Sequence, residues 1–256
     1  MTIHSVGVVA AMPQEIAPLL RRVARYSKER TAGCNLYRFE MAGVPVALIE
    51  SGMGPKHAAA ATAALIANAA PGCLLNFGFA GGVLPGTGVG DLVLAERVLY
   101  LKEGRLNEVP QPDPRLNRLV AEALAAAPLK LQQGTFVTAA VITNKATLTG
   151  LLEAGIRHPM LEMETAALLQ VAAGAGIPVV ALRGVSDAAG EELGFSLEEF
   201  CDNELRISVP RVLKTIARKP WIIPQLIRLS GNTKCAGESL ALGVELALKA
   251  LCAPPP

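Results

Sequence analysis

Three carboxylates and one arginine lie close together in residues 160–187. Glu162 and Glu164 come directly before an Ala/Leu-rich run, and Asp187 follows an apolar run that contains Arg183. Arginine is rarely buried without a partner, so Arg183 predicts an ion pair inside the fold. Open α/β sheets keep their ligand sites at the carboxyl ends of strands, where Asp187 is expected. The pattern indicates a site for acid–base chemistry, and a helix cap plus a structural salt bridge is the alternative interpretation.

The elements that must position these residues alternate between helix and strand. Residues 165–173 are predicted to form a helix that ends at Gly174, and residues 177–185 a buried strand with Pro178 at its start. Upstream we predict strands at 5–11, 73–79, 91–101 and 135–143, a hairpin within 36–50, and helices at 13–23, 57–69, 116–127 and 146–154. This alternation predicts one α/β domain around a central sheet.

Composition narrows the class of protein. The chain has 256 residues, 51% of them hydrophobic, which is enough for a large single core. A net charge of +2 argues against a nucleic-acid-binding protein. Five scattered cysteines without a CxxC pair, and no metal-ligand spacing, predict a cytoplasmic protein with reduced thiols and no bound metal. The first residues are predicted to form a strand and not a signal peptide, and no apolar stretch reaches the roughly 20 residues of a membrane span.

A glycine turn at residues 51–56 is a candidate anion site. Gly52 and Gly54 follow a GxG pattern that lacks the third glycine of a dinucleotide-binding loop, and Lys56 lacks the spacing of a P-loop. Backbone N–H groups at the start of the next helix, with Lys56 beside them, could hold a phosphate. A plain tight turn is the alternative.

Four blocks of the sequence carry a resemblance to a known family. Residues 8–15 (VVAAMPQE), 78–82 (GFAGG), 161–165 (LEMET) and 183–187 (RGVSD) have the order and spacing of the purine nucleoside phosphorylase and methylthioadenosine nucleosidase superfamily. The resemblance spans roughly residues 3–200. It implies a single-domain, three-layer fold with a twisted, partly closed, mixed sheet flanked by helices, usually assembled as a homo-oligomer.

The resemblance also implies roles in cleaving a purine–ribose bond. Asp187 would pass a proton to N7 of the leaving base. Glu164 would bind the ribose hydroxyls, with Met163 under the sugar, and Glu15 would activate water or contact the 5′ side. Arg183 would hold Asp187 or Glu15. The other expected substrate contacts are Glu162, Phe79, Ala80, Gly81 and Ser186.

One departure from the family pattern concerns the nucleophile. Phe79 stands where many members have a serine that holds phosphate or water, and Asn76 stands where an arginine often binds phosphate. Backbone N–H groups at residues 80–82, or Lys56, would then hold the nucleophile. Gly54, Lys56 and Gly82 are therefore the predicted phosphate or water site.

The C-terminal part of the chain is basic. Residues 205–237 contain seven Lys and Arg and no acidic residue, while the rest has 17 basic and 22 acidic residues. The segment Pro-Trp-Ile-Ile-Pro (220–224) within it is typical of an interfacial membrane contact, and a helix packed on the sheet is the alternative. This region resembles the hopanoid-associated phosphorylase branch, whose implied substrate is the lipid-tailed adenosylhopane. We therefore expect a catalytic domain at 1–204 and a helical extension at 205–256 that packs on the same domain. The last helix of this extension is expected to cover residues 238–251. Residues 205–235 are expected to contact the inner face of a membrane.

Three functions stay open at this stage. The main expectation is phosphorolysis of a 5′-substituted adenosine, with phosphate as co-substrate, no cofactor and release of the free base. The second is hydrolysis of methylthioadenosine or S-adenosylhomocysteine by a nucleosidase. The third is a module that binds nucleosides without turnover. The dependence of adenine release on phosphate separates the first two.

Overall fold

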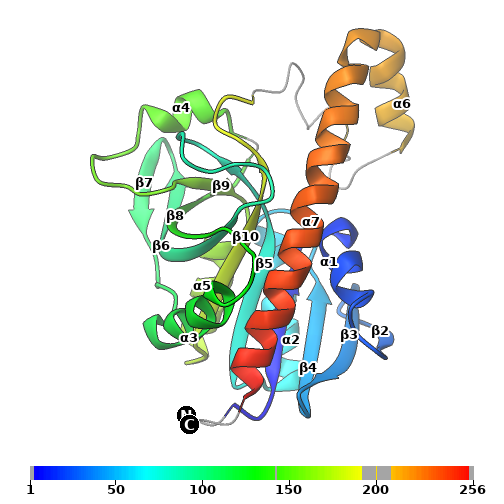
Figure 1. Ribbon diagram of the computed structural model, residues 1–256, viewed down its shortest axis with the longest axis vertical. Coiled ribbons are helices and arrows are strands. Elements are labelled where there is room, and N and C mark those ends of the chain that lie inside the picture. The colour runs from blue at the N-terminus through cyan, green and yellow to red at the C-terminus, as the bar shows by residue number, and fades with distance from the viewer. Residues whose placement is uncertain (1–2, 142, 192–199, 201–208, 254–256) are drawn as a thin grey trace.

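A mixed sheet forms the centre of the molecule (Figure 1). The computed structural model describes residues 3–141, 143–191, 200 and 209–253. Within these residues the strands are β1 (Val6–Ala10), β2 (Ser27–Thr31), β3 (Cys34–Met41), β4 (Val44–Glu50), β5 (Cys73–Gly82), β6 (Leu92–Lys102), β7 (Arg105–Glu108), β8 (Leu131–Ala139), β9 (Met160–Glu162) and β10 (Val179–Asp187). The helices are α1 (Pro13–Leu20), α2 (Pro55–Ala69), α3 (Pro114–Ala125), α4 (Lys145–Thr149), α5 (Thr165–Gly174), α6 (Val209–Arg218), the short 3-10 helix η2 (Pro220–Ile222) and α7 (Ile223–Cys252).

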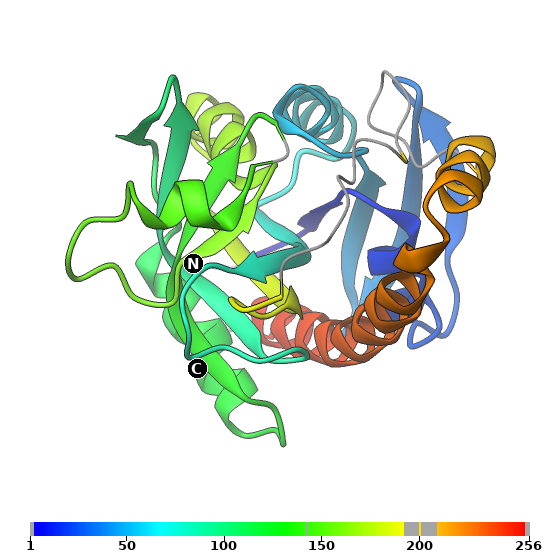
Figure 2. The same cartoon turned by 90° about the horizontal axis from the view of Figure 1, so that it is seen from above.

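The sheet closes on itself at one side. Its order is β10-β6-β8-β9-β5-β1-β4-β3-β2, and β10 also pairs with β5, so that five of the described strands form a ring. β1, β5 and β10 run parallel, whereas β9 runs antiparallel to β5 and β6 antiparallel to β10. Seen from above, α2 and α5 cover one side of the sheet and α7 lies along the other (Figure 2). The predicted α/β fold with a mixed, partly closed sheet is confirmed.

Close packing of α7 on the sheet depends on two glycines. A Cβ added to Gly184 of β10 would lie 3.2 Å from the carbonyl oxygen of Ala236, and one added to Gly243 of α7 would lie 2.5 Å from Leu92. The helix therefore sits against the strand backbones, and its buried residues, among them Leu240, join the larger hydrophobic core. Interiors packed this tightly leave no room for even one extra methyl group.

Several predicted boundaries differ from the structure. Asp187 is the last residue of β10 instead of following the strand, α4 is shorter than predicted, and β2, β7 and β9 were not predicted. The last helix starts at Ile223 and not at residue 238, because Pro224 in a first turn costs no hydrogen bond. The expected domain boundary at 204/205 lies outside the described residues. α7 has 30 residues, but within the described chain no helix is long and apolar enough to cross a membrane.

Candidate active site

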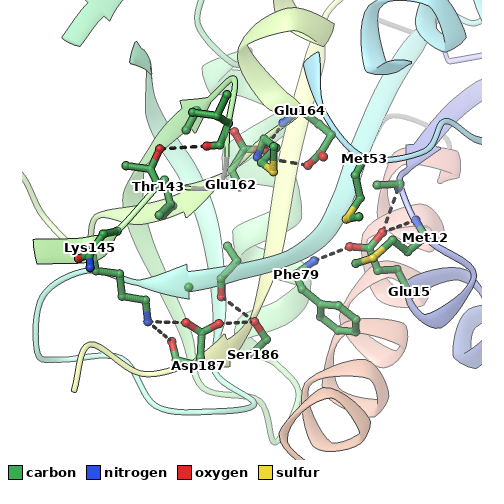
Figure 3. Close-up of a pocket in the computed structure, with 18 of the residues that line it drawn as sticks. Met12, Glu15, Met53, Phe79, Thr143, Lys145, Glu162, Glu164, Ser186 and Asp187 are labelled. Carbon is green, nitrogen blue, oxygen red and sulfur yellow. Dashed lines mark hydrogen bonds and ion pairs between the residues drawn. The ribbon is translucent and has the colours of Figure 1, made fainter. Parts of the chain in front are cut away.

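A cavity of about 510 Å³ opens where β5 and β10 end. Glu15 from α1, Glu164 from the start of α5 and Asp187 from β10 all line it. The close-up shows these three side chains on different sides of the same space (Figure 3). The structure thus brings together the three carboxylates to which the sequence assigned the main roles.

Glu15 is held in the first turn of α1 by backbone N–H groups. Its Oε2 accepts hydrogen bonds from the N–H groups of Ala11 and Met12, both at 2.9 Å, and its Oε1 accepts one from the Phe79 N–H at 2.8 Å. A Cβ on Gly78 would lie 2.7 Å from Oε1, so glycine at this position lets the carboxylate reach β5. The side chain is only 3% exposed, and this burial raises the pKa of Glu15 above its ordinary value, although the Phe79 N–H opposes the shift. A base of raised pKa suits proton abstraction near neutral pH.

Glu164 occupies the position before α5. Its Oε1 accepts a hydrogen bond from the Gly54 N–H at 2.9 Å. Gly54 has a φ of +95°, a conformation that favours glycine, and it turns this N–H toward the carboxylate. Burial, and after it the neighbouring carboxylate of Glu162, raises the pKa of Glu164 to about 8. The glycine turn therefore binds a carboxyl group, and that group belongs to the protein itself.

A buried network supports Glu164 from behind. The Oε2 of Glu162 accepts hydrogen bonds from the Arg183 guanidinium at 2.6 Å, the Glu164 N–H at 3.0 Å and the Thr165 N–H at 2.9 Å. Its other oxygen accepts a hydrogen bond from the Thr138 hydroxyl. Burial alone would raise the pKa of Glu162, but Arg183 and these donors hold that pKa below its usual range. Glu162 is thus an ionised anchor that orients the backbone of Glu164.

One predicted role in this network stays open and another differs from the structure. Glu162 lines the cavity, as expected of a substrate contact, but its carboxylate also accepts hydrogen bonds from protein donors, so direct contact with substrate stays a prediction. Arg183 was expected to hold Asp187 or Glu15, but it donates to Glu162 and, at 2.8 Å, to the side-chain oxygen of Asn76. Asp187 lies four positions beyond Arg183 along the extended strand, a distance of about 13 Å, so the two side chains act at different depths of the sheet.

Asp187 is held by a lysine that the sequence did not single out. Lys145, at the start of α4, forms an ion pair with Asp187 Oδ2 and donates to the carbonyl oxygen of Ala188 at 2.8 Å. Ser186 donates its hydroxyl to Asp187 Oδ1 at 2.7 Å. A Cβ on Gly81 would lie 2.7 Å from Asp187 Oδ2 and 2.9 Å from Lys145 Cε. A cation in the first turn of a helix opposes the helix dipole, and this was the signal that could have identified Lys145.

The three residues predicted to hold phosphate or water do not line the cavity. Lys56 is exposed and lies outside the cavity lining, and Gly82 faces Thr87 instead of the cavity. Gly54 is engaged by Glu164, as described above. The spacing of these residues in the sequence suggested that they lie near one another. It did not predict on which side of its strand or helix each residue lies.

The remaining lining residues are mostly apolar. The predicted contacts Phe79, Ala80, Gly81, Met163 and Ser186 do line the cavity. Met12 and Met53 line it as well, beside Glu15, and neither was predicted (Figure 3). With Met163, three methionines line the cavity and give it an adaptable apolar surface.

Comparison with known proteins identifies the family. The model of the Phosphorylase superfamily matches residues 5–218. The chain belongs to the phosphorylase superfamily. It is 31% identical over 226 residues to the 5′-methylthioadenosine/S-adenosylhomocysteine nucleosidase of Geobacillus kaustophilus, covering 82% of this chain and 96% of that relative. The corresponding enzyme of Halalkalibacterium halodurans is 29% identical, covering 83% of this chain and 98% of the relative.

Solved structures show the same fold. The Campylobacter jejuni 5′-methylthioadenosine/S-adenosylhomocysteine nucleosidase superposes with a TM-score of 0.74 at 22% identity, covering 96% of this chain and 99% of that one. The futalosine hydrolase of Helicobacter pylori superposes with a TM-score of 0.73 at 17% identity, covering 95% and 97%. The chain is accordingly an enzyme of this superfamily, related to nucleosidases.

Proposed function

We propose that this enzyme hydrolyses the N-glycosidic bond of a 5′-substituted adenosine and releases adenine. The observation that carries the proposal is Glu15, a buried carboxylate fixed by three backbone N–H groups at the wall of the cavity that also holds Glu164 and Asp187. The names of the curated relatives support adenosine derivatives as substrates.

The three carboxylates have complementary parts in this reaction. Glu15 takes a proton from a water molecule while the water oxygen forms a bond to C1′ of the ribose. The C1′–N9 bond breaks, its electron pair goes to the purine, and Asp187 passes to N7 a proton that it takes up from solvent. The proton on Glu15 then returns to solvent. Glu164 binds the ribose hydroxyls next to Met163. The positive charge that develops on the sugar favours the ionised form of Glu164, and that form stabilises the oxocarbenium character. General acid and general base catalysis of this kind each contribute about 10²–10⁴-fold.

Water fits the nucleophile position better than phosphate. Lys145 is the one cation among the described residues that line the cavity, and it is paired with Asp187. A second anion beside the Glu15 carboxylate would meet electrostatic repulsion in a site of low dielectric constant. Phosphorolysis, the main expectation from the sequence, is therefore replaced here by the hydrolytic alternative, which the relatives' names also support.

The 5′ side of the substrate is proposed to be apolar. Met12 and Met53 line the cavity beside Glu15. Flexible thioether side chains of this kind can adapt to a methylthio group or to a longer hydrocarbon. The lipid-tailed adenosine that the C-terminal resemblance implies belongs to this same class. Assembly as a homo-oligomer stays a prediction.

Adenine release from 5′-methylthioadenosine tests the proposal. We expect turnover in phosphate-free buffer, a rate that added phosphate does not change, and a free reducing sugar as co-product. Glu15→Gln should lower kcat by about 10²–10⁴-fold with little change in substrate binding. Strict dependence on phosphate, a sugar 1-phosphate product, or binding without turnover would each overturn hydrolysis.

A further inference from the structure

An exposed apolar surface lies at the end of the molecule where the cavity opens. The first residues of α7 and the helix α6 extend beyond the carboxyl ends of the strands (Figure 1). Trp221, Ile223 and Ile227 at this end are 67%, 41% and 68% exposed. We call these three residues the apolar tip. They are half of the large hydrophobic residues that the described part of the chain leaves exposed.

The apolar tip is separate from the residues of this segment that pack inside the protein. Ile222, Leu226 and Leu229 form the inner side of this segment and pack with Val212 of α6 and with Phe200. Ile223 and Ile227 are four residues apart on α7 and therefore lie on one stripe of the helix, away from that small core. The segment has two apolar sides, and one of them has no described partner within the chain.

Cations flank the apolar tip along the sequence. Lys214, Arg218, Arg228 and Lys234 are all exposed, and no acidic residue occurs anywhere from 205 to 237. Two copies of this chain meeting through a twofold interface would bring these like charges together, because such an interface pairs each patch with itself. The charge therefore fits an anionic partner better than a second copy.

We propose that the apolar tip and the cations that flank it in α6 and α7 dock the enzyme onto an anionic lipid bilayer. Trp221 lies at the level of the headgroups, Ile223 and Ile227 enter the acyl boundary, and the cations contact the anionic headgroups. Tryptophan with aliphatic residues inside a basic rim is the combination that interfacial segments use.

Docking would bring the cavity close to the bilayer. Glu191, which lines the cavity, accepts a hydrogen bond from Asn232 of α7 at 3.0 Å. The Phe79 ring in the cavity wall lies beside Gly237 of the same helix. At a rise of about 1.5 Å per residue, the ten residues from Ile227 to Gly237 span about 15 Å, which is within reach of a lipid tail on the 5′ carbon of a bound nucleoside. This step rests on the proposed function, whereas docking itself does not.

Tryptophan fluorescence reports docking directly, since Trp221 is the one tryptophan of the chain. We expect vesicles of phosphatidylcholine with phosphatidylglycerol to shift the Trp221 emission to shorter wavelength. The full-length enzyme should also cosediment with these vesicles. Vesicles of phosphatidylcholine alone should do neither. Salt should weaken binding, because the Debye length falls from about 10 Å at 0.1 M to about 3 Å at 1 M.

Two variants keep the reporter and separate the contributions. Ile227→Ser should weaken partitioning onto anionic vesicles about tenfold, and Leu119→Ser on α3, where leucine is 38% exposed, is the matched control that should not. Arg228→Gln combined with Lys234→Gln should weaken it about 30-fold. Adenine release from soluble methylthioadenosine should be unchanged in all three.

Three results would overturn docking: no binding to anionic vesicles, equal binding to both kinds of vesicle, or an emission shift that follows protein concentration without vesicles. The last would mean that a second copy covers the apolar tip. An enzyme that binds vesicles but releases no adenine refutes the proposed function alone, and the reverse result refutes docking alone.

Discussion

Replacing Arg183 with methionine tests whether the buried network holds the site together. Both partners of the Arg183–Glu162 ion pair are almost fully buried, with side chains 1% and 0% exposed. Removing one partner of a buried pair costs about 3–5 kcal/mol, because the other charge stays buried without compensation. The Nε of Arg183 has no hydrogen-bond partner in the described part of the chain, and its removal returns about 1 kcal/mol. We therefore expect Arg183→Met to lower the free energy of unfolding by about 2–4 kcal/mol.

Urea unfolding followed by circular dichroism, at fixed protein concentration and neutral pH, measures this loss. Glu162→Gln in the Arg183→Met background removes the unpaired charge, so the double variant should be more stable than Arg183→Met alone. The KM for nucleoside should also rise in Arg183→Met, since Glu162 orients the backbone of Glu164. A loss below about 1 kcal/mol, or a double variant less stable than Arg183→Met, would refute the assignment of Glu162 as an ionised anchor.

Three further variants probe the catalytic groups. Gly81→Ala places a methyl group 2.7 Å from Asp187 Oδ2 and should lower kcat about 100-fold. Gly174→Ala is the control and should keep wild-type activity, because its added Cβ has no neighbour within 4 Å. Lys145→Met should lower kcat about 100-fold with a smaller effect on KM. Partial rescue of kcat by Lys145→Arg in steady-state assays would show that the cation positions Asp187. An unchanged kcat in Lys145→Met would exclude that role. Burial raises the pKa of Glu164 from 4.5 to about 8, so the folded protein binds more protons than the unfolded chain in this window and loses stability as pH rises through it. Glu164→Gln lacks this loss, so its Tm relative to wild type should increase from pH 5 to pH 8, and parallel curves in thermal unfolding would contradict the raised pKa.

The sequence by itself determined the local elements and the short motifs. The apolar runs and helical spacing predicted most strands and helices because each period reflects which side of an element is buried. The first helical turn placed Glu15, the helix start placed Glu164, and the end of a strand placed Asp187, all within a few residues of their observed positions. These features depend on interactions between residues that are close in the sequence.

Only the tertiary structure decided which side chains meet. The Gly54 N–H contacts Glu164 across 110 residues of sequence, and Lys145 reaches Asp187 from a separate helix. Arg183 reaches Glu162 instead of Asp187, because its place along β10 sets how deep in the sheet its side chain acts. Such contacts depend on strand order and on the direction of each side chain, and neither is encoded in the spacing of residues along the chain.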